Sequence, residues 1–299
     1  MDVVPGHAAV DAERPRFEPG DGGWPAAPAP LPSPVADSHC HLDMSLDENR
    51  YGPPVELSLA LDAAEAVGVD RVVQIGCDVE GAGWAVAAAE RDQRVVAGVA
   101  LHPNEAPRLE QRQELSAALD TIEQLAQHPR VRAIGETGLD FFRTGVSGQS
   151  VQEESFRWHI DLAKRTSKAL VIHDRDAHDD VVRVLLDEGP PEQVVFHCFS
   201  GDARLASTCA DHGWVMSFAG TVTFKSAESI RNGLLVAPLD LLLVETDAPY
   251  LTPTPFRGRP NSSYLIPYTI RTMSQVRGVA VEEMCAAIDR NTTRVFGAW

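Results

Sequence analysis

One short apolar run of this chain ends in Asp37-Ser38-His39-Cys40-His41-Leu42-Asp43, a pattern typical of the end of a β-strand. Residues two apart on a strand point to the same side, so His39 and His41 face one way and Cys40 faces the other. Two imidazoles side by side can form half of a metal site, because neutral imidazole is the commonest metal-binding side chain. An isolated His-x-His pair is more often accidental or structural than metal-binding. Other residues of the chain are therefore needed to predict a metal site.

Apolar runs rich in Val and Ile recur along the chain and alternate with amphipathic stretches. The eight runs cover residues 35–43, 71–78, 95–103, 131–140, 169–176, 193–200, 213–220 and 241–249. Helices are expected over residues 54–67, 80–91, 107–127, 151–165, 177–188, 202–211, 225–236, 264–276 and 281–296. Continuous apolar strands separated by helices predict a parallel sheet covered by helices. Eight such units predict an α/β fold of the (β/α)8 TIM-barrel type. The alternative, a doubly wound open sheet, usually has a Gly-rich turn after its first strand, and this chain has none there.

The composition divides the chain into two parts. Residues 1–33 are rich in Pro, Ala and Gly and predict a disordered tail, with docking of Trp24 onto the body as the alternative. Residues 34–299 form the predicted barrel domain, and 44% hydrophobic residues overall provide a large core. The formal net charge of −17 argues against non-specific coating of nucleic acid, although it leaves room for a local phosphate site.

The five cysteines contain no C-x-x-C pair and mostly sit within apolar runs. They are expected to be reduced thiols of a cytoplasmic protein. The chain shows no signal-peptide pattern and no apolar run of membrane-spanning length, so no membrane association is expected. No feature of the sequence predicts an obligate protein partner.

Ionisable side chains stand at the carboxyl ends of most of these runs, where barrel enzymes place their catalytic groups. They are His39, His41, His102, Glu136, Asp140, His173, Arg175, His197, Glu245 and Asp247. Each one alone has a structural explanation, but an ionisable group at a buried strand end must be paired or bound to metal. Four histidines and two carboxylates suit two divalent ions that share one bridging carboxylate. The other histidines, which we interpret as structural or solvated, are His7, His128, His159, His178 and His212.

Several ordered motifs then carry a resemblance to a known family. They are Asp37-Ser38-His39-Cys40-His41-Leu42, Leu101-His102-Pro103, Gly135-Glu136-Thr137-Gly138-Leu139-Asp140, His173-Asp174-Arg175, His197-Cys198-Phe199-Ser200-Gly201, Glu245-Thr246-Asp247-Ala248-Pro249-Tyr250-Leu251, Phe256-Arg257-Gly258 and Asn261. From about residue 35 to its end the chain resembles the TatD family of metal-dependent deoxyribonucleases, within the amidohydrolase-type metal barrels.

The resemblance implies two divalent metal ions. One would be bound by His39, His41, Glu136 and Asp247, and the other by Glu136, His173 and His197, so that Glu136 would bridge them. Many relatives in the wider superfamily use a carboxylated Lys on strand four, and this strand has no Lys. The ions could be Mg²⁺, Mn²⁺ or Zn²⁺, since imidazoles favour transition ions and nuclease chemistry often uses Mg²⁺ or Mn²⁺.

The implied function is a deoxyribonuclease with DNA as a transiently bound substrate. Asp247 would be the general base, and His102 would contact a phosphate oxygen or the leaving group, unless it makes only a structural hydrogen bond. Arg143 and Arg175 are candidate phosphate contacts because guanidinium fits phosphate bidentately, with surface salt bridges as the alternative. The same two readings apply to Arg257 and Arg259. The scarcity of basic residues predicts local binding, and hence exonuclease action on single strands or ends.

Aromatic residues and departures from the family pattern affect the expected substrate. Phe141 and Phe142 could stack a base or merely pack the loop after strand four. Relatives commonly have a His where this chain has Asn104, and often a Pro in the segment that here reads Ser262-Ser263-Tyr264. The alternative function is therefore hydrolysis of a small-molecule ester, lactone or amide on the same barrel. A non-catalytic binding protein is a third possibility, which the full set of proposed ligands argues against.

Overall fold

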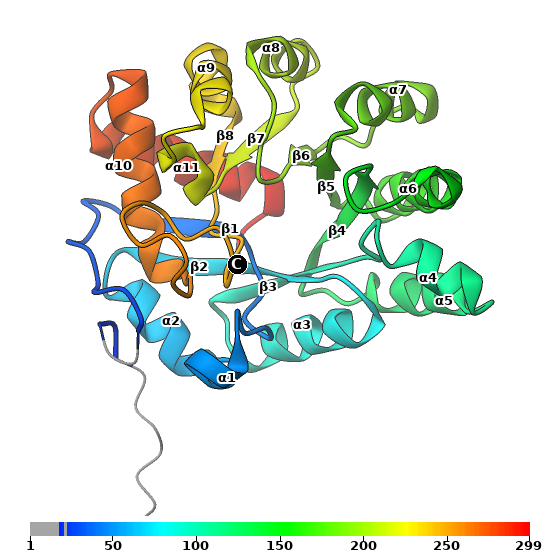
Figure 1. Cartoon of the computed structure of the whole chain (residues 1–299), viewed down its shortest axis with the longest axis horizontal. Coiled ribbons are helices and arrows are strands. Elements are labelled where there is room, and N and C mark those ends of the chain that lie inside the picture. The colour runs from blue at the N-terminus through cyan, green and yellow to red at the C-terminus, as the bar shows by residue number, and fades with distance from the viewer. Residues whose placement is uncertain (1–17, 21–22) are drawn as a thin grey trace, which may run out of the picture.

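The computed structural model describes residues 18–20 and 23–299 of the chain. Eight parallel strands follow one another in the order β1 to β8 and are surrounded by helices, as Figure 1 shows. The strands are β1 (Val35–Cys40), β2 (Val69–Gly76), β3 (Val95–Val99), β4 (Val131–Asp140), β5 (Ala169–Arg175), β6 (Val194–Phe196), β7 (Val215–Phe218) and β8 (Leu242–Val244). The (β/α)8 barrel expected from the sequence is confirmed.

The barrel closes at the carboxyl ends of its first and last strands. A bridge joins Cys40 to Ala248, and the backbone N–H of His41 donates to the Ala248 carbonyl at 2.8 Å. The N–H of Asp247 donates to the His39 carbonyl at 2.9 Å. Closure therefore brings the two expected metal ligands at the end of β1, His39 and His41, beside the expected base that follows β8.

Helices cover the outside of the barrel. They are α1 (Glu48–Tyr51), α2 (Leu57–Glu65), α3 (Val79–Arg91), α4 (Ala106–Gln111), α5 (Leu115–Leu125), α6 (Val146–Thr166), α7 (His178–Glu188), α8 (Ala203–Asp211), α9 (Glu228–Val236), α10 (Ile266–Arg277) and α11 (Val281–Phe296). The single helix predicted over 107–127 is wrong, because it divides into α4 and α5. Gln113, between them, has a φ of 60°, a left-handed backbone that an α-helix cannot continue. No helix among the described residues is long and apolar enough to cross a membrane.

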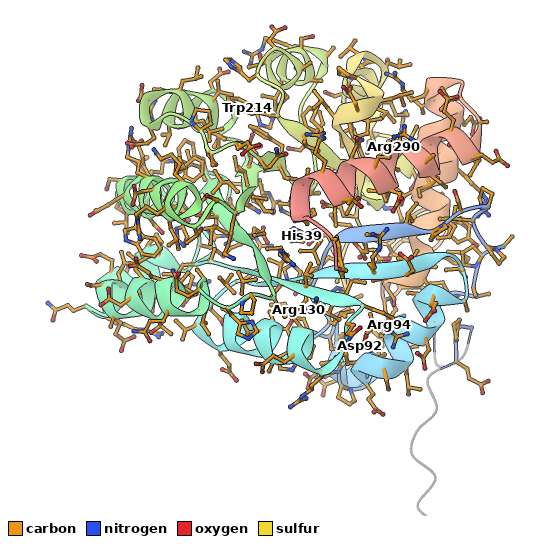
Figure 2. All side chains as sticks on the ribbon, turned by 180° about the vertical axis from the view of Figure 1, so that it is seen from behind. His39, Asp92, Arg94, Arg130, Trp214 and Arg290 are labelled. Atoms are coloured by element: carbon orange, nitrogen blue, oxygen red, sulfur yellow. The ribbon has the colours of Figure 1, made fainter. Side chains whose placement is uncertain are left out.

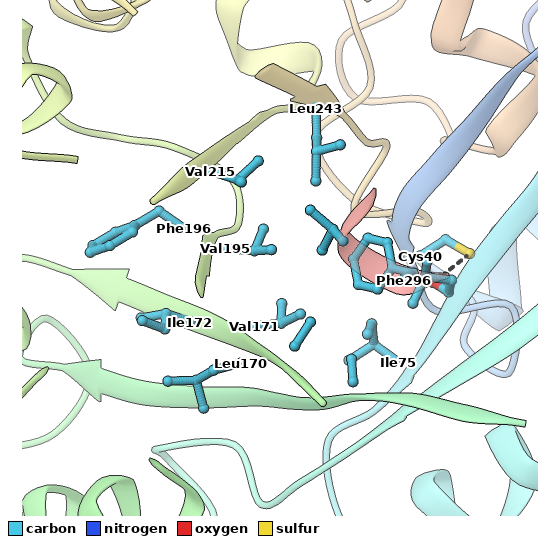
Figure 3. Packing of buried hydrophobic residues seen from close by; sticks show 14 of the residues in the cluster. Cys40, Ile75, Leu170, Val171, Ile172, Val195, Phe196, Val215, Leu243 and Phe296 are labelled. Carbon is cyan, nitrogen blue, oxygen red and sulfur yellow. Dashed lines mark hydrogen bonds between the residues drawn. The ribbon is translucent and has the colours of Figure 1, made fainter. Parts of the chain in front are cut away.

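The core consists of aliphatic side chains from the strands packed against helix residues. Figure 3 shows part of it, with Val171, Val195 and Leu243 from the strands and Phe296 from α11. These residues are at most 2% exposed, so their transfer from water supplies the main driving force of folding. All five cysteines are free thiols. The barrel is thus held together by apolar packing.

The end of the predicted tail belongs to the barrel domain. The Tyr264 hydroxyl donates to the Pro25 carbonyl at 2.7 Å, and Arg271 donates to the Ala29 carbonyl at 2.6 Å. Leu31 is 8% exposed, and its N–H donates to Val67 at 2.9 Å. Trp24 packs against the core, as the docking alternative expected.

Residues 23–33 of the predicted tail therefore lie against the barrel. Residues 23–33 find both apolar contacts and hydrogen-bond donors on the barrel, which composition alone does not reveal. Residues 1–17 and 21–22 of the predicted tail lie outside the described residues.

Candidate metal centre

The six expected metal ligands converge at the carboxyl end of the barrel. Four of them, His41, Glu136, His173 and Asp247, line a cavity of about 550 Å³ whose walls also include His102, Arg143, Arg175 and Tyr250. Figure 2, in which His39 is labelled, places that residue near the middle of the barrel. The ligands come from different strands because each strand ends at the same rim.

Glu136 of β4 lies at the centre of the cluster, and its two carboxylate oxygens face different imidazoles. Oε2 is 3.3 Å from His39 Nε2 and 3.8 Å from His41 Nε2. Oε1 is 2.6 Å from His173 Nδ1, 3.0 Å from His197 Nε2 and 3.4 Å from His102 Nε2. This division is the arrangement expected of a carboxylate that bridges two cations.

Asp247 completes the first of these groups. Its Oδ1 is 3.3 Å from His41 Nε2 and 3.9 Å from His39 Nε2. The residue has a φ of 54°, a left-handed conformation that Asp tolerates better than most side chains. The side chain remains partly open to the cavity, at 17% exposure, whereas that of Glu136 is at 5%.

The donor atoms present fit divalent cations. His39 Nδ1, His39 Nε2 and His173 Nε2 are buried without a hydrogen-bond partner, which is costly unless another group satisfies them. Three sets of ligand atoms lie within 4.8 Å of one another: His39–His41–Glu136, His39–His197–Glu245 and His102–Glu136–His173. Imidazole nitrogens with carboxylate oxygens suit Zn²⁺ and other transition ions.

The electrostatics of the cluster also call for cations. Burial by itself would raise the pKa of Glu136, but His197, His102 and His173 lower that pKa well below its ordinary range. Burial likewise opposes ionisation of Asp247, yet His41 and His197 lower its pKa. Both carboxylates are therefore ionised, and metal ions would replace protons as their counter-charge.

His102 lies nearer to the expected ligands than its predicted role as a non-ligand suggests. The backbone N–H of Asn104 donates to His102 Nδ1 at 3.0 Å, which directs Nε2 toward Glu136. Burial lowers the pKa of His102, so the ring is neutral. Because Nδ1 accepts the hydrogen bond from Asn104, the neutral ring carries its proton on Nε2 and can donate it to Glu136 or to a substrate.

Glu245 was expected at the end of its strand, but the sequence assigned no role to it. It is fully buried, and its Oε1 accepts hydrogen bonds from His197 Nδ1 at 3.1 Å and from the Cys198 N–H at 2.8 Å. Such a carboxylate fixes the tautomer and orientation of a metal-binding imidazole. Glu245 lies in the same apolar run as Asp247, and this position was the sequence signal that could have indicated a role in the site.

Cys77 was also missed, because the end of the second apolar run was not considered. Its thiol lies 3.5 Å from Glu136 Oε2, and burial raises the pKa of the thiol to about 12. Cys77 is therefore a neutral hydrogen-bond donor to the central carboxylate.

Asn104, a departure from the family pattern, contacts the cluster indirectly through Asp140. Its side-chain amide donates to Asp140 Oδ2 at 2.8 Å, and the same oxygen lies 3.4 Å from His173 Nε2. The Arg143 N–H donates to Asp140 Oδ1 at 2.8 Å. Asn104 thus ties the loop after β3 to the loop that carries Arg143.

The rim residues have different surroundings. Arg143 and Arg175 both line the cavity, and the Arg175 guanidinium lies 4.0 Å from the centre of the Phe142 ring. Phe142 is 62% exposed, whereas Phe141 packs against the core as the packing alternative expected. Arg257 instead lies over Phe224, at 4.1 Å.

Asp37 connects β1 to the loops that follow β8. Its Oδ1 accepts from the Thr246 N–H at 2.9 Å, and its Oδ2 bonds the hydroxyls of Thr246 and Ser263 at 2.5 and 2.8 Å. Ser263 belongs to the second departure from the family pattern. Complete burial raises the pKa of Asp37 to about 7, although these hydrogen bonds lower it.

Replacement of this carboxyl predicts a pH-dependent change in stability. Between its ordinary pKa of 3.8 and about 7, Asp37 is protonated in the folded chain but not in the unfolded one. Its stabilising contribution is therefore present at low pH and lost as pH rises through about 7. Asn mimics the protonated form, so Asp37→Asn should gain about 3 kcal/mol relative to the parent protein between about pH 4.5 and about pH 8. Urea unfolding of metal-free protein measures this gain.

The control for this prediction is Asp211→Asn, which alters an exposed carboxylate at the end of α8. Its unfolding free energy should run parallel to that of the parent protein at every pH. Parallel curves for Asp37→Asn as well would show that Asp37 is ionised in the folded state throughout this range.

Comparison with known proteins adds to this geometry. A family model described as TatD related DNase matches residues 36–297. The chain is 45% identical over 269 residues to the uncharacterized metal-dependent hydrolase TatD of Mycobacterium tuberculosis, covering 88% of this chain and 98% of that protein. It is 36% identical over 270 residues to the uncharacterized metal-dependent hydrolase YcfH of Escherichia coli, covering 88% of this chain and 95% of that protein. The crystal structure of YJJV, a TatD homologue from Escherichia coli, superposes with a TM-score of 0.79 at 26% identity, covering 89% of this chain and 98% of that one.

Proposed function

The chain belongs to the TatD family of metal-dependent hydrolases, and from this premise we propose that it is a deoxyribonuclease acting on single-stranded DNA or DNA ends. The observation that carries the proposal is an ionised Glu136 carboxylate between two groups of imidazoles, on the floor of a cavity with arginines at its mouth. Neither Arg143 nor Arg175 forms an ion pair with any described residue, so both guanidinium groups are available to phosphate.

We assign the metal ligands as the family resemblance implied them. One ion would be held by His39, His41, Glu136 and Asp247, and the second by Glu136, His173 and His197. When bound, the two ions would polarise a phosphodiester and lower the pKa of a nearby water. Mg²⁺, Mn²⁺ and Zn²⁺ are the candidates.

The protein's own residues then orient the substrate and move the proton. Asp247 accepts the proton of the attacking water on its carboxylate, since it is the acid of the cluster that stays open to the cavity. His102 donates a hydrogen bond through Nε2 to a phosphate oxygen. Glu245 keeps His197 in place through its Nδ1.

The rim favours a flexible, unpaired strand. The exposed Phe142 ring, with Arg175 on one face, offers the other face to a nucleobase, and stacking of this kind requires an unpaired base. Two arginines on a chain of net charge −17 cannot follow a long duplex backbone. Binding is therefore short and local.

A second function has one observation in its favour. Asp78 lines the same cavity as the arginines and forms no ion pair with any described residue, and a carboxylate repels a polyanionic strand. A small uncharged ester, lactone or amide would escape this repulsion and use the same metal centre.

A nuclease assay on metal-stripped protein separates these functions. With Mg²⁺, Mn²⁺ or Zn²⁺ added back, end-labelled single-stranded DNA should shorten stepwise, at least about tenfold faster than blunt duplex, because only unpaired bases can stack on Phe142. Equal rates on both substrates would contradict the preference for single strands. Hydrolysis of a small lactone without DNA cleavage, by protein shown to contain two metal ions, would establish the second function.

A further inference from the structure

Four basic side chains gather around a second cavity, of about 570 Å³, at the end of the barrel opposite to the metal centre. They are Arg132 at the start of β4, Lys164 in the last turn of α6, Lys168 just before β5 and Arg294 in the last turn of α11. Figure 2 shows α11, in red, running across the near side of the barrel in that view. This basic cavity has no part in the proposed hydrolytic site.

The lining of the basic cavity is positively charged, although the protein as a whole is acidic. The lining contains four cationic side chains and one acidic side chain, Glu192, and therefore has a net charge of +3. The whole chain carries −17. No ion pair joins any of the four cations to an acid within residues 18–20 and 23–299. A concave site lined by one sign of charge concentrates its field and attracts ions of the opposite sign.

Backbone carbonyls are the main partners of these cations. Lys168 donates to Val131 at 2.5 Å, Lys164 to Glu188 at 2.8 Å, Arg132 to Ala298 at 3.2 Å and Arg294 to Asp240 at 2.6 Å. Neutral carbonyl dipoles orient the cations but do not cancel their charge. Donor capacity also remains, because Arg132 Nε is buried without any hydrogen-bond partner.

Arg132 and Lys168 are half-buried, whereas Lys164 and Arg294 are exposed. Burial, and then the charge of Arg132, lower the pKa of Lys168. Two half-buried like charges repel each other, and a bound anion would compensate them. A bound anion would satisfy Arg132 Nε and relieve this repulsion at once.

We propose that the basic cavity is a second binding site, which takes a small phosphate-bearing anion of at least two negative charges. The net lining charge of +3 calls for a multiply charged ligand, and the arginine fork matches phosphate oxygens. Ser167 adds a hydroxyl, while Pro190, Pro191 and Phe296 add apolar walls for an organic substituent. The volume lies within the range of small-molecule sites. Free diphosphate and an organic phosphate ester share this chemistry.

Calorimetric titration of metal-free, full-length protein with inorganic pyrophosphate, and separately with glycerol 2-phosphate, tests the site. Saturable binding should weaken about tenfold or more in Lys168→Gln, because a charged hydrogen bond to the ligand is lost. Tighter binding of pyrophosphate would identify free diphosphate as the source, and tighter binding of glycerol 2-phosphate would identify an ester. Arg294→Gln, at an exposed position, provides a second variant if Lys168→Gln unfolds, and it should weaken binding in the same direction.

Two matched controls localise the binding. Arg175→Gln removes a cation from the mouth of the metal centre, and Arg271→Gln removes one that also bonds backbone carbonyls elsewhere. Neither should change the Lys168-dependent binding. The proposal is overturned if neither ligand binds, or if binding weakens in Arg175→Gln but not in Lys168→Gln and Arg294→Gln.

Discussion

Glu136→Gln is expected to lose both bound metal and hydrolysis. Gln keeps the shape of the side chain but removes the negative charge that lies within 3.8 Å of five imidazoles, in a buried site where the loss of a charge has its largest effect. Metal ions supply several kcal/mol of transition-state stabilisation, so activity should fall about a thousandfold or more. Metal analysis after gel filtration, together with the nuclease assay, measures the two losses.

The matched control is Glu105→Gln, which makes the same change in a residue that lines the same cavity and pairs with Arg108. It should retain its full metal content. If Glu136→Gln also retained two metal ions per chain, Glu136 would not be the bridge, and the set of His39, His197 and Glu245 would become the alternative centre.

The barrel could be predicted because most of its strands contain apolar residues on both faces. Runs such as β3 and β7 are buried from end to end, and this is the pattern of a parallel sheet under helices. The boundaries were harder to predict. The run expected over 193–200 has its strand only over Val194–Phe196, and His197 already lies in a loop. The apolar pattern continues past the point where the hydrogen bonding of the strand ends.

The site was predictable in its residue types but not in its contacts. The rule that strand ends meet at one rim places His39, His173 and Asp247 together without knowledge of any distance. Which carboxylate orients which imidazole depends on the backbone beyond the strands. Cys198 and Asp247 both have left-handed φ values, of 42° and 54°, which the sequence does not signal. For this reason the contact of Glu245 with His197 could not be foreseen.

The basic cavity escaped prediction for a related reason. Arg132, Lys168 and Arg294 lie far apart in the sequence, and each resembles an ordinary surface cation. They come together only in the folded barrel, where the end of α11 packs beside the starts of β4 and β5. A composition with net charge −17 conceals such a local concentration of positive charge.

Asp247→Asn is expected to stop turnover while most of the metal remains bound. Asn keeps an oxygen near His41 and His39 and tolerates the φ of 54°, so the site should stay assembled. It cannot accept the proton of the attacking water. General-base catalysis contributes about 10²–10⁴-fold, and kcat should fall by this factor with little change in KM.

The best control for this loss is Asp176→Asn, because Asp176 follows β5 at the same rim and has a similar φ of 57°. Both variants replace Asp by Asn at a position with a left-handed backbone. They differ because Asp247 contacts the imidazoles of the metal centre. We therefore expect full activity from Asp176→Asn. Activity retained in Asp247→Asn would remove the role of Asp247 as base.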